Sequence, residues 1–199
     1  MDLFTAGTET ASSTIIWCIL LILHFPDVQT KIHEELDREV GLCRRPTMQD
    51  QSSLPYLRAV IKETQRLVSI VPFSLLHQTN EKITIGDYDI PKGTRVIPHL
   101  DSVLHDPHIW GPDVDVFRPE RFLDNEGKVV HPEQFIPFSL GPRVCFGENM
   151  AKTELFLFLS SMFQRFRFEC PDPENPPSLT PVIGLTAAFS SYKVVCLER

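Results

Sequence analysis

The sequence predicts a mainly α-helical protein with small antiparallel β-sheets, an α+β fold. Three observations lead to this class: helical patterns fill residues 1–70, the hydrophobic period changes to that of strands at 82–98, and a long helical pattern covers 148–167. An irregular connection rich in proline and glycine occupies 105–147, and a final hairpin is expected at 182–197. We expect the 199 residues to belong to a single domain.

The first helix is expected to be a core helix. Residues 1–25 begin small and polar and become almost wholly apolar, and a helix that is apolar on all sides is buried in something large. No helix-start signal precedes it, so the chain is expected to enter within a helix. The apolar run Thr14–Phe25 is about twelve residues long, which is too short to cross a bilayer core of about 30 Å. We therefore expect neither a signal peptide nor a membrane anchor in this chain.

Two more helices follow within the first 70 residues. Pro26 breaks the first helix, and an amphipathic pattern over 27–40 is closed by Gly41. Residues 44–53 read as a linker, and apolar residues at helical spacing predict a third helix over 54–70.

The strand signals lie around a turn at Gly86-Asp87. The residues on either side, 82–85 and 88–90, have the alternation of a hairpin, and Pro91-Lys92-Gly93 leads into a further strand at 94–98. The connection that follows is unusually long for a structureless segment, and such segments are usually functional.

Composition narrows the class of function. The net charge of -7 argues against a nucleic-acid surface, which is normally basic. The five cysteines are scattered and odd in number, with no C-x-x-C pair, which favours reduced thiols over a disulfide framework or a structural zinc site.

Cys145 stands in the most unusual stretch of the chain, Phe-Ser-Leu-Gly-Pro-Arg-Val-Cys-Phe-Gly-Glu at 138–148. It lies just before a predicted helix, where free N–H groups and the helix dipole favour an anion, and Arg143 adds positive charge. Both favour a thiolate, the form of cysteine that attacks electrophiles and binds metals. Three readings are open from the residues alone: a redox nucleophile, an axial ligand to iron, or a structural turn with an incidental cysteine.

Three other motifs accompany this stretch. Glu63 and Arg66 share one helix face at i, i+3, which is also the pattern of a solvated surface pair. Pro119-Glu-Arg-Phe could bring the guanidinium of Arg121 to Glu63. Ala6-Gly-Thr-Glu-Thr places a glycine inside a helix at a cost of about 1 kcal/mol, which is tolerable where a ligand approaches the backbone.

In this order the four motifs resemble the cytochrome P-450 family of haem-thiolate monooxygenases. The pattern F-x-x-G-x-R-x-C-x-G is matched by Phe138, Gly141, Arg143, Cys145 and Gly147. The surrounding residues are similar to those of the animal microsomal group, which oxidises lipids and foreign compounds. The resemblance covers the whole chain and identifies it as the C-terminal part of the P-450 fold.

The resemblance implies a haem cofactor. Cys145 would be the axial thiolate ligand to the iron, the ligation that P-450 enzymes use to favour O–O cleavage. Phe138 and Gly147 would pack beside the ligand, and Arg143 would pair with a haem propionate. His77 matches a second propionate ligand, although a histidine after a helix is also simply a polar loop residue.

The resemblance also assigns roles outside the haem cradle. Glu63, Arg66 and Arg121 would form a buried structural triad, and Glu9 and Thr10 would deliver protons during oxygen activation. The positions that would line the substrate pocket, for which core packing is the alternative reading, are Phe4, Ala6, Gly7, Val71, Leu76 and Leu185.

The activity implied is insertion of one oxygen atom of O2 into a small lipophilic substrate such as a fatty acid, a steroid or a xenobiotic. Electrons would come from NADPH through NADPH-cytochrome P-450 reductase, at the cytoplasmic face of the endoplasmic reticulum membrane. Family members are more than twice as long, so the chain is expected to lack the membrane anchor and the helices that roof the pocket. Two alternatives stay open: a P-450-like isomerase or dehydrase, and an inactive truncated fragment without stable haem.

Overall fold

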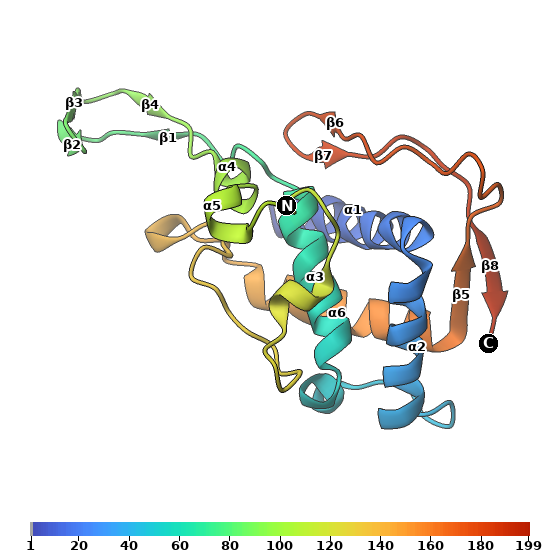
Figure 1. Ribbon diagram of the computed structural model, residues 1–199. Helices are drawn as coiled ribbons and strands as arrows, with labels where there is room; N and C mark the ends of the chain where they lie inside the picture. Colours follow the sequence, from blue (N-terminus) through green and yellow to red (C-terminus); the bar gives the residue numbers. More distant parts are fainter. Residues whose placement is uncertain (1) are drawn as a thin grey trace.

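The computed structural model describes residues 2–199 and confirms the mixture of helices with small antiparallel sheets (Figure 1). Four helices form the body: α1 (Asp2–His24), α2 (Pro26–Glu39), α3 (Pro55–Val68) and α6 (Glu148–Arg165). Each of them contacts the other three. Their shared core includes Cys18, Ile22, Ile32, Leu36, Leu57, Val60, Phe156, Leu159 and Phe163.

Helix α1 is longer than the apolar run that predicted it. The small and polar residues before Thr14 extend the helix, so Phe4–His24 is long and apolar enough to cross a membrane by length and composition alone. The prediction that this segment is too short to span a bilayer is therefore wrong. The second half of α1 nevertheless lies inside the protein, since Trp17 to Ile22 are all at most 7% exposed.

The connection between α2 and α3 is more ordered than the expected linker. Gly41, at φ 69°, ends α2 as predicted, and its N–H donates to the Leu36 carbonyl at 2.9 Å. A short 3-10 helix, η1 (Met48–Ser53), follows, and a capping box between Thr47 and Asp50 caps its N-terminus. Helix α3 then ends at Val68, two residues earlier than predicted.

A buried carboxylate joins α2 to α3. Glu35 of α2 is 4% exposed, and its two oxygens accept from the backbone N–H groups of Tyr56 (2.7 Å) and Leu57 (2.9 Å). These groups are in the first turn of α3, which has no other side-chain cap. Burial raises the pKa of Glu35, while the two backbone N–H groups act in the opposite direction.

The single sheet predicted over 82–98 is wrong in its pairing. Strands β2 (Ile83–Ile85) and β3 (Tyr88–Ile90) form the expected hairpin, but β4 (Arg95–Val96) pairs with β1 (His77–Gln78), outside the predicted segment. The turn at Pro91-Lys92-Gly93 sends the chain back along residue 79, where the Gly93 N–H donates to the Thr79 carbonyl at 2.9 Å. Figure 1 shows these four strands as an arm that extends from the helical body.

Short helices interrupt the connection expected at 105–147. Three lie within it: α5 (Pro107–Trp110), η2 (Pro119–Phe122) and η3 (Gly141–Arg143). A fourth, α4 (Leu100–Leu104), comes directly before it. Helices α4, α5 and η2 contribute to a second small core made by Ala59, Leu104, Trp110, Val114 and Phe122. Much of the connection is therefore fixed against α3.

The C-terminal hairpin predicted over 182–197 is also wrong. Helix α6 stops at Arg165, and β5 (Phe166–Glu169) pairs with β8 (Val195–Glu198), while β6 (Val182–Ile183) pairs only with β7 (Ala187–Ala188). Phe166 already has the extended backbone of a strand, and Phe168 on β5 is buried in the main core. Burial of that ring against the helices fixes β5 as the partner of the final strand.

His33 on α2 predicts a loss of stability in mild acid. Its ring stacks edge-on against Phe163, and its Nε2 has no hydrogen-bond partner among the described residues. Burial first, and the charge of Arg199 second, lower its pKa from 6.5 to about 4. Between these two pH values the folded protein thus binds fewer protons than the unfolded chain. The contribution of neutral His33 to stability is therefore fully present above pH 6.5 and is lost as the pH falls toward 4.

Denaturant unfolding at neutral pH and near pH 5 measures this effect. After discounting for the partial exposure of the ring, we expect the free energy of unfolding to fall by about 1 kcal/mol through His33. In His33→Gln that component of the decrease is expected to disappear. An unchanged pH dependence in the variant would show that other groups cause it.

Candidate functional site

The segment 138–148 folds into a tight turn that presents Cys145 in front of α6. Ser139 and Gly141 both adopt positive φ, 66° and 74°, a conformation that occurs in tight turns. The Cys145 N–H donates to the Phe138 carbonyl at 3.0 Å, which closes the turn. Helix α6 begins at Glu148 and has no side-chain cap, so its first N–H groups lie beside the cysteine.

The Cys145 side chain is exposed, and the residues next to it are apolar and exposed as well. Leu140 is 65% exposed, Val144 42% and Phe146 76%. A Cβ atom added at Gly147 would lie 3.9 Å from the Cys145 sulfur, so the glycine keeps this side of the thiol uncrowded. An accessible thiol surrounded by exposed apolar side chains is suited to a large, flat, apolar ligand.

These residues fit a haem. Among the described residues there is no group of three or more His, Cys, Asp or Glu that could hold a metal ion, so the lone Cys145 thiol suits an iron that a macrocycle already holds. Arg143 is exposed and has no hydrogen bond or ion pair with any described residue, which leaves its guanidinium free for a carboxylate. The exposed thiol, the apolar side chains around it and the unpaired guanidinium occur within six residues of each other.

The two other predicted cradle residues lie on different elements. Phe138 is half-buried at the start of the turn, and the ammonium of Lys152 from α6 lies 5.7 Å from its ring centroid. His77 lies on β1, half-buried, with its Nδ1 2.9 Å from the Leu75 carbonyl. That contact leaves the other ring nitrogen, Nε2, available to a ligand.

Glu63, Arg66 and Arg121 come together in the interior. Arg66 donates to both Glu63 oxygens, at 2.7 and 2.9 Å, and Arg121 Nε donates to Oε1 at 3.1 Å. The Glu63 and Arg66 side chains are 0% exposed and that of Arg121 is 4% exposed. The reading of Glu63 and Arg66 as a solvated surface pair is therefore wrong.

Backbone groups complete this triad, and sequence reasoning missed them. Arg66 also donates to the carbonyls of Leu104 (2.9 Å) and Val114 (2.7 Å). The backbone N–H of Arg118 donates to Glu63 at 3.0 Å, and Arg121 donates to the Trp110 carbonyl at 2.6 Å. No sequence signal marks a carbonyl as a partner, but the density of Pro, Asp and Arg over 112–121 was a usable hint that this stretch is fixed.

The acid and alcohol of the first helix are neighbours without a bond between them. Thr10 Oγ1 donates to the Ala6 carbonyl at 2.7 Å, within α1. Glu9 accepts from Thr186 Oγ1 at 2.8 Å, across to the turn between β6 and β7. No described atom lies within 4 Å of a Cβ built at Gly7, so this part of α1 has open space beside it.

Most of the predicted pocket positions are exposed rather than packed in the core. Phe4 is 79%, Leu76 63% and Leu185 74% exposed, Ala6 is also exposed, and Val71 is half-buried. For Phe4, Leu76 and Leu185 the core-packing reading is therefore wrong.

Hydrogen bonds tie together the three segments that carry these positions. The Ala187 N–H donates to the Ile70 carbonyl at 2.8 Å, and Trp17 of α1 donates to the Ala187 carbonyl at 2.9 Å. The three segments are thus linked to one another, and each carries an apolar side chain that is not buried, at Phe4, Leu76 and Leu185.

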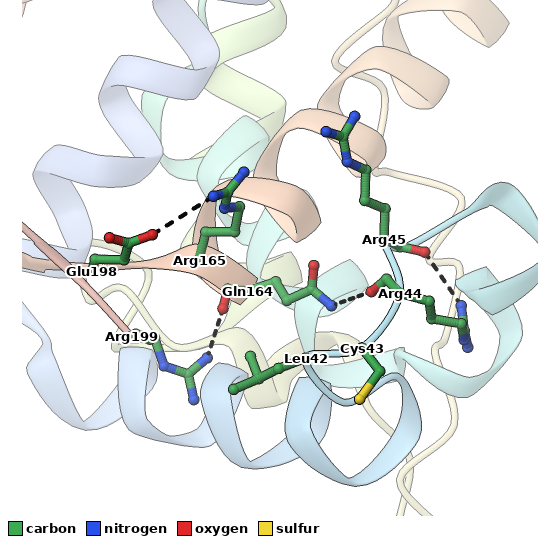
Figure 2. A pocket seen from close by; sticks show the side chains of 8 residues that line it. All are labelled: Leu42, Cys43, Arg44, Arg45, Gln164, Arg165, Glu198 and Arg199. Carbon is green, nitrogen blue, oxygen red and sulfur yellow. Dashed lines mark hydrogen bonds and ion pairs between the residues drawn. The ribbon is translucent and has the colours of Figure 1, made fainter.

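The larger of the two described cavities, about 310 Å³, lies elsewhere (Figure 2). It is lined by the chain after α2, the end of α6 and the end of β8, at Leu42, Cys43, Arg44, Arg45, Gln164, Arg165, Glu198 and Arg199. Most of its cations already have acidic partners: Arg44 with Asp50 at 2.6 Å and Arg199 with Asp37 at 2.6 Å. None of its lining residues belongs to the Cys145 turn, so the larger described cavity is not the candidate site.

Comparisons with known proteins agree with this geometry. The family model described as Cytochrome P450 matches residues 1–194. The chain is 44% identical to human cytochrome P450 2U1 over 198 residues, which are 100% of the chain and 36% of the relative. It is 44% identical to mouse (Mus musculus) cytochrome P450 2D26 and 43% identical to human cytochrome P450 2D6, again over 100% of the chain and 40% of each relative.

The chain therefore spans between 36% and 40% of the length of these relatives. The Cys145 turn, the buried triad and the family match over nearly every residue lead to one conclusion: this chain belongs to the cytochrome P450 family.

Proposed function

We propose that this chain is the haem-bearing part of a monooxygenase that inserts one oxygen atom of O2 into a small lipophilic substrate. The observation that carries the proposal is the exposed Cys145 thiol, held in a closed turn at the start of α6 with Arg143 unpaired beside it. When bound there, a thiolate-ligated haem supplies the oxidising chemistry that favours O–O cleavage. Family membership supports a monooxygenase of this general type.

The cradle residues would divide the work of holding the haem. Cys145 would bind the iron, with the N–H groups at the start of α6 moderating its charge. Arg143 would pair with one propionate and the free nitrogen of His77 with another, while Phe138 and Gly147 would pack near the sulfur. Phe146, Leu140 and Val144 would then lose their exposure to solvent, which is favourable for apolar side chains.

Glu9 and Thr10 would move protons to the oxygen side of the haem. The Thr186 hydroxyl donates to the Glu9 carboxylate at 2.8 Å, so this solvent-exposed acid is held beside the turn between β6 and β7. The Thr10 hydroxyl uses its own proton on Ala6, which leaves its oxygen lone pairs to accept from a water or from Glu9 in its protonated form. A proton would pass along these groups from solvent.

Exposed apolar side chains support the substrate class, and family membership supports the redox partner. Phe4, Leu76 and Leu185 offer apolar contact and no charge, which suits a fatty acid chain, a steroid or a xenobiotic. Electrons would come from NADPH through NADPH-cytochrome P-450 reductase, and the enzyme would work at the cytoplasmic face of the endoplasmic reticulum membrane.

Product formation in a chimaera tests the proposal, with the N-terminal part of human cytochrome P450 2U1 placed before residue 1. With the reductase, NADPH and isotopically labelled dioxygen, we expect one labelled oxygen atom in a hydroxylated lipophilic product. In Thr10→Val, we expect product formed per NADPH consumed to fall about tenfold or more, because a lost proton relay typically costs 10²–10⁴-fold. Mass spectrometry of the product and NADPH absorbance measure the two quantities.

Thr153→Val is the matched control, since Thr153 also donates to a carbonyl one helical turn back, at Asn149, but on α6. Unlabelled product would contradict oxygen insertion from dioxygen. Equal coupling in Thr10→Val and wild type would remove Thr10 from proton delivery without affecting the haem assignment.

A further inference from the structure

A second cavity, of about 190 Å³, lies between α3, the chain at 131–140 and the start of α6. Its walls are mostly apolar, from Pro132, Phe135, Ile136, Phe138, Leu140 and Val144. Among its few charged groups are Lys62, Lys152 and Glu148. The haem cradle does not use Lys62, and the proposed monooxygenase chemistry does not require it.

The amine of Lys62 is held in this cavity without an acidic partner. Its Nζ lies 3.2 Å from His131 Nδ1 and 4.4 Å from the ring centroid of Phe135. The ring of Phe122 closes another side, at 5.4 Å. None of the described carboxylates lies within ion-pair distance of Lys62, and Glu148, which also lines the cavity, is paired with Lys152 at 2.5 Å.

The charged groups that face Lys62 are mainly cations. Arg58 lies one turn earlier on α3, and Lys152 is on α6. His131, on the connection, is uncharged in most molecules at neutral pH, because burial first, and then the charges of Lys62 and Arg58, lower its pKa below 6.5. Burial first, and then the charges of Lys152 and Arg58, lower the pKa of Lys62 to about 8. At neutral pH an ordinary lysine at 10.5 is neutral in fewer than about one molecule in a thousand, whereas this amine is neutral in about one molecule in ten.

We propose that Lys62 is a nucleophilic lysine that forms an imine with a small aldehyde carrying an anionic group. Desolvation and a neighbouring cation activate lysine as a nucleophile in enzymes that form imines. The apolar walls accommodate the body of the aldehyde, and Lys152 and Arg58 attract its anionic group. Three wall residues, Phe138, Leu140 and Val144, are shared with the proposed haem cradle, but Lys62 itself takes no part in holding the haem.

The reaction needs no oxidant or reductant. The lone pair of the neutral amine attacks the carbonyl carbon, a C–N bond forms, and the carbonyl oxygen takes up a proton. His131, 3.2 Å from the amine, can accept the proton that leaves nitrogen and return it to the departing hydroxyl group. One water molecule is released as the C=N bond forms.

Labelling of the 199-residue chain with para-carboxybenzaldehyde, followed by cyanoborohydride reduction and peptide mass spectrometry, tests the proposal. At about pH 7.5 we expect Lys62 to be labelled roughly tenfold or more faster than Lys92 and Lys128, because far more of its amine is neutral. Lys92 is exposed, and Lys128 is exposed and paired with Glu126. We also expect para-carboxybenzaldehyde to label Lys62 several-fold faster than benzaldehyde.

Two variants separate this role from a structural one. Lys152→Met removes a neighbouring cation and frees the Glu148 carboxylate, so labelling of Lys62 should slow and the preference for the anionic aldehyde should fall. The matched change Lys128→Met should alter neither. Labelling of Lys62 no faster than that of Lys92 in the wild-type chain would overturn the proposal, as would binding of the aldehyde that leaves no adduct after reduction.

Discussion

Replacing Cys145 by serine is expected to remove the thiolate-type Soret band from the reduced carbon monoxide spectrum of this chain completely. The described residues offer no second thiol in a comparable place, since Cys145 alone combines exposure, a turn closed onto Phe138 and the start of a long helix. A serine hydroxyl is almost never ionised at neutral pH and cannot replace a thiolate at iron. The measurement is the spectrum of the 199 residues expressed with a supply of haem.

Cys43→Ser and Cys196→Ser are matched controls, because both cysteines are exposed and lie outside the turn. Both variants should keep the wild-type spectrum. A thiolate-type band that survives in Cys145→Ser would disprove the ligand assignment, and a wild-type chain without the band would show that these residues alone do not hold haem.

Replacing Glu63 by glutamine is expected to lower the free energy of unfolding by about 3–5 kcal/mol. The change leaves Arg66, 0% exposed, as a buried cation without its carboxylate partner, and leaves Arg121, 4% exposed, with only a longer contact to Asp113 at 3.4 Å. It also weakens the hydrogen bond from the Arg118 backbone N–H, which holds the connection against α3. Since a domain of this kind is stable by about 5–15 kcal/mol in total, much of its stability would be lost.

Denaturant unfolding followed by circular dichroism measures this difference. Glu126→Gln is the matched control, because Glu126 pairs with Lys128 at the surface and both side chains are more than 70% exposed. We expect that variant to change stability by less than about 1 kcal/mol. Equal effects of the two substitutions would contradict a structural role for the buried triad.

The local features of this protein could be predicted from its sequence. Helix ends follow from single residues: Pro26 occupies the first turn of α2, and Gly41 ends that helix with a positive φ that other residues resist. The β2–β3 hairpin follows from Gly86-Asp87. The Cys145 turn is also local, because its closing hydrogen bond joins residues only seven apart.

The features that the sequence did not predict join distant segments. Strand β8 pairs with β5 rather than with its sequence neighbours, and β4 pairs with β1. A two- to four-residue strand carries too little pattern to specify its partner. The choice is made by what the strand buries, as Phe168 does against the helical core.

The candidate site, like the fold, has features that are local in the sequence and features that depend on contacts between distant segments. The sequence alone determined the family, the Cys145 turn and the i, i+3 geometry of Glu63 and Arg66, because each depends on residue types within one turn or one helix. Only the tertiary structure decided which backbone groups complete the Glu63 triad, that Glu9 bonds to Thr186 and that Lys62 lies beside His131 with no described carboxylate in ion-pair distance. Burial and partner choice are set by packing between segments far apart in the chain, and spacing along the sequence does not encode them.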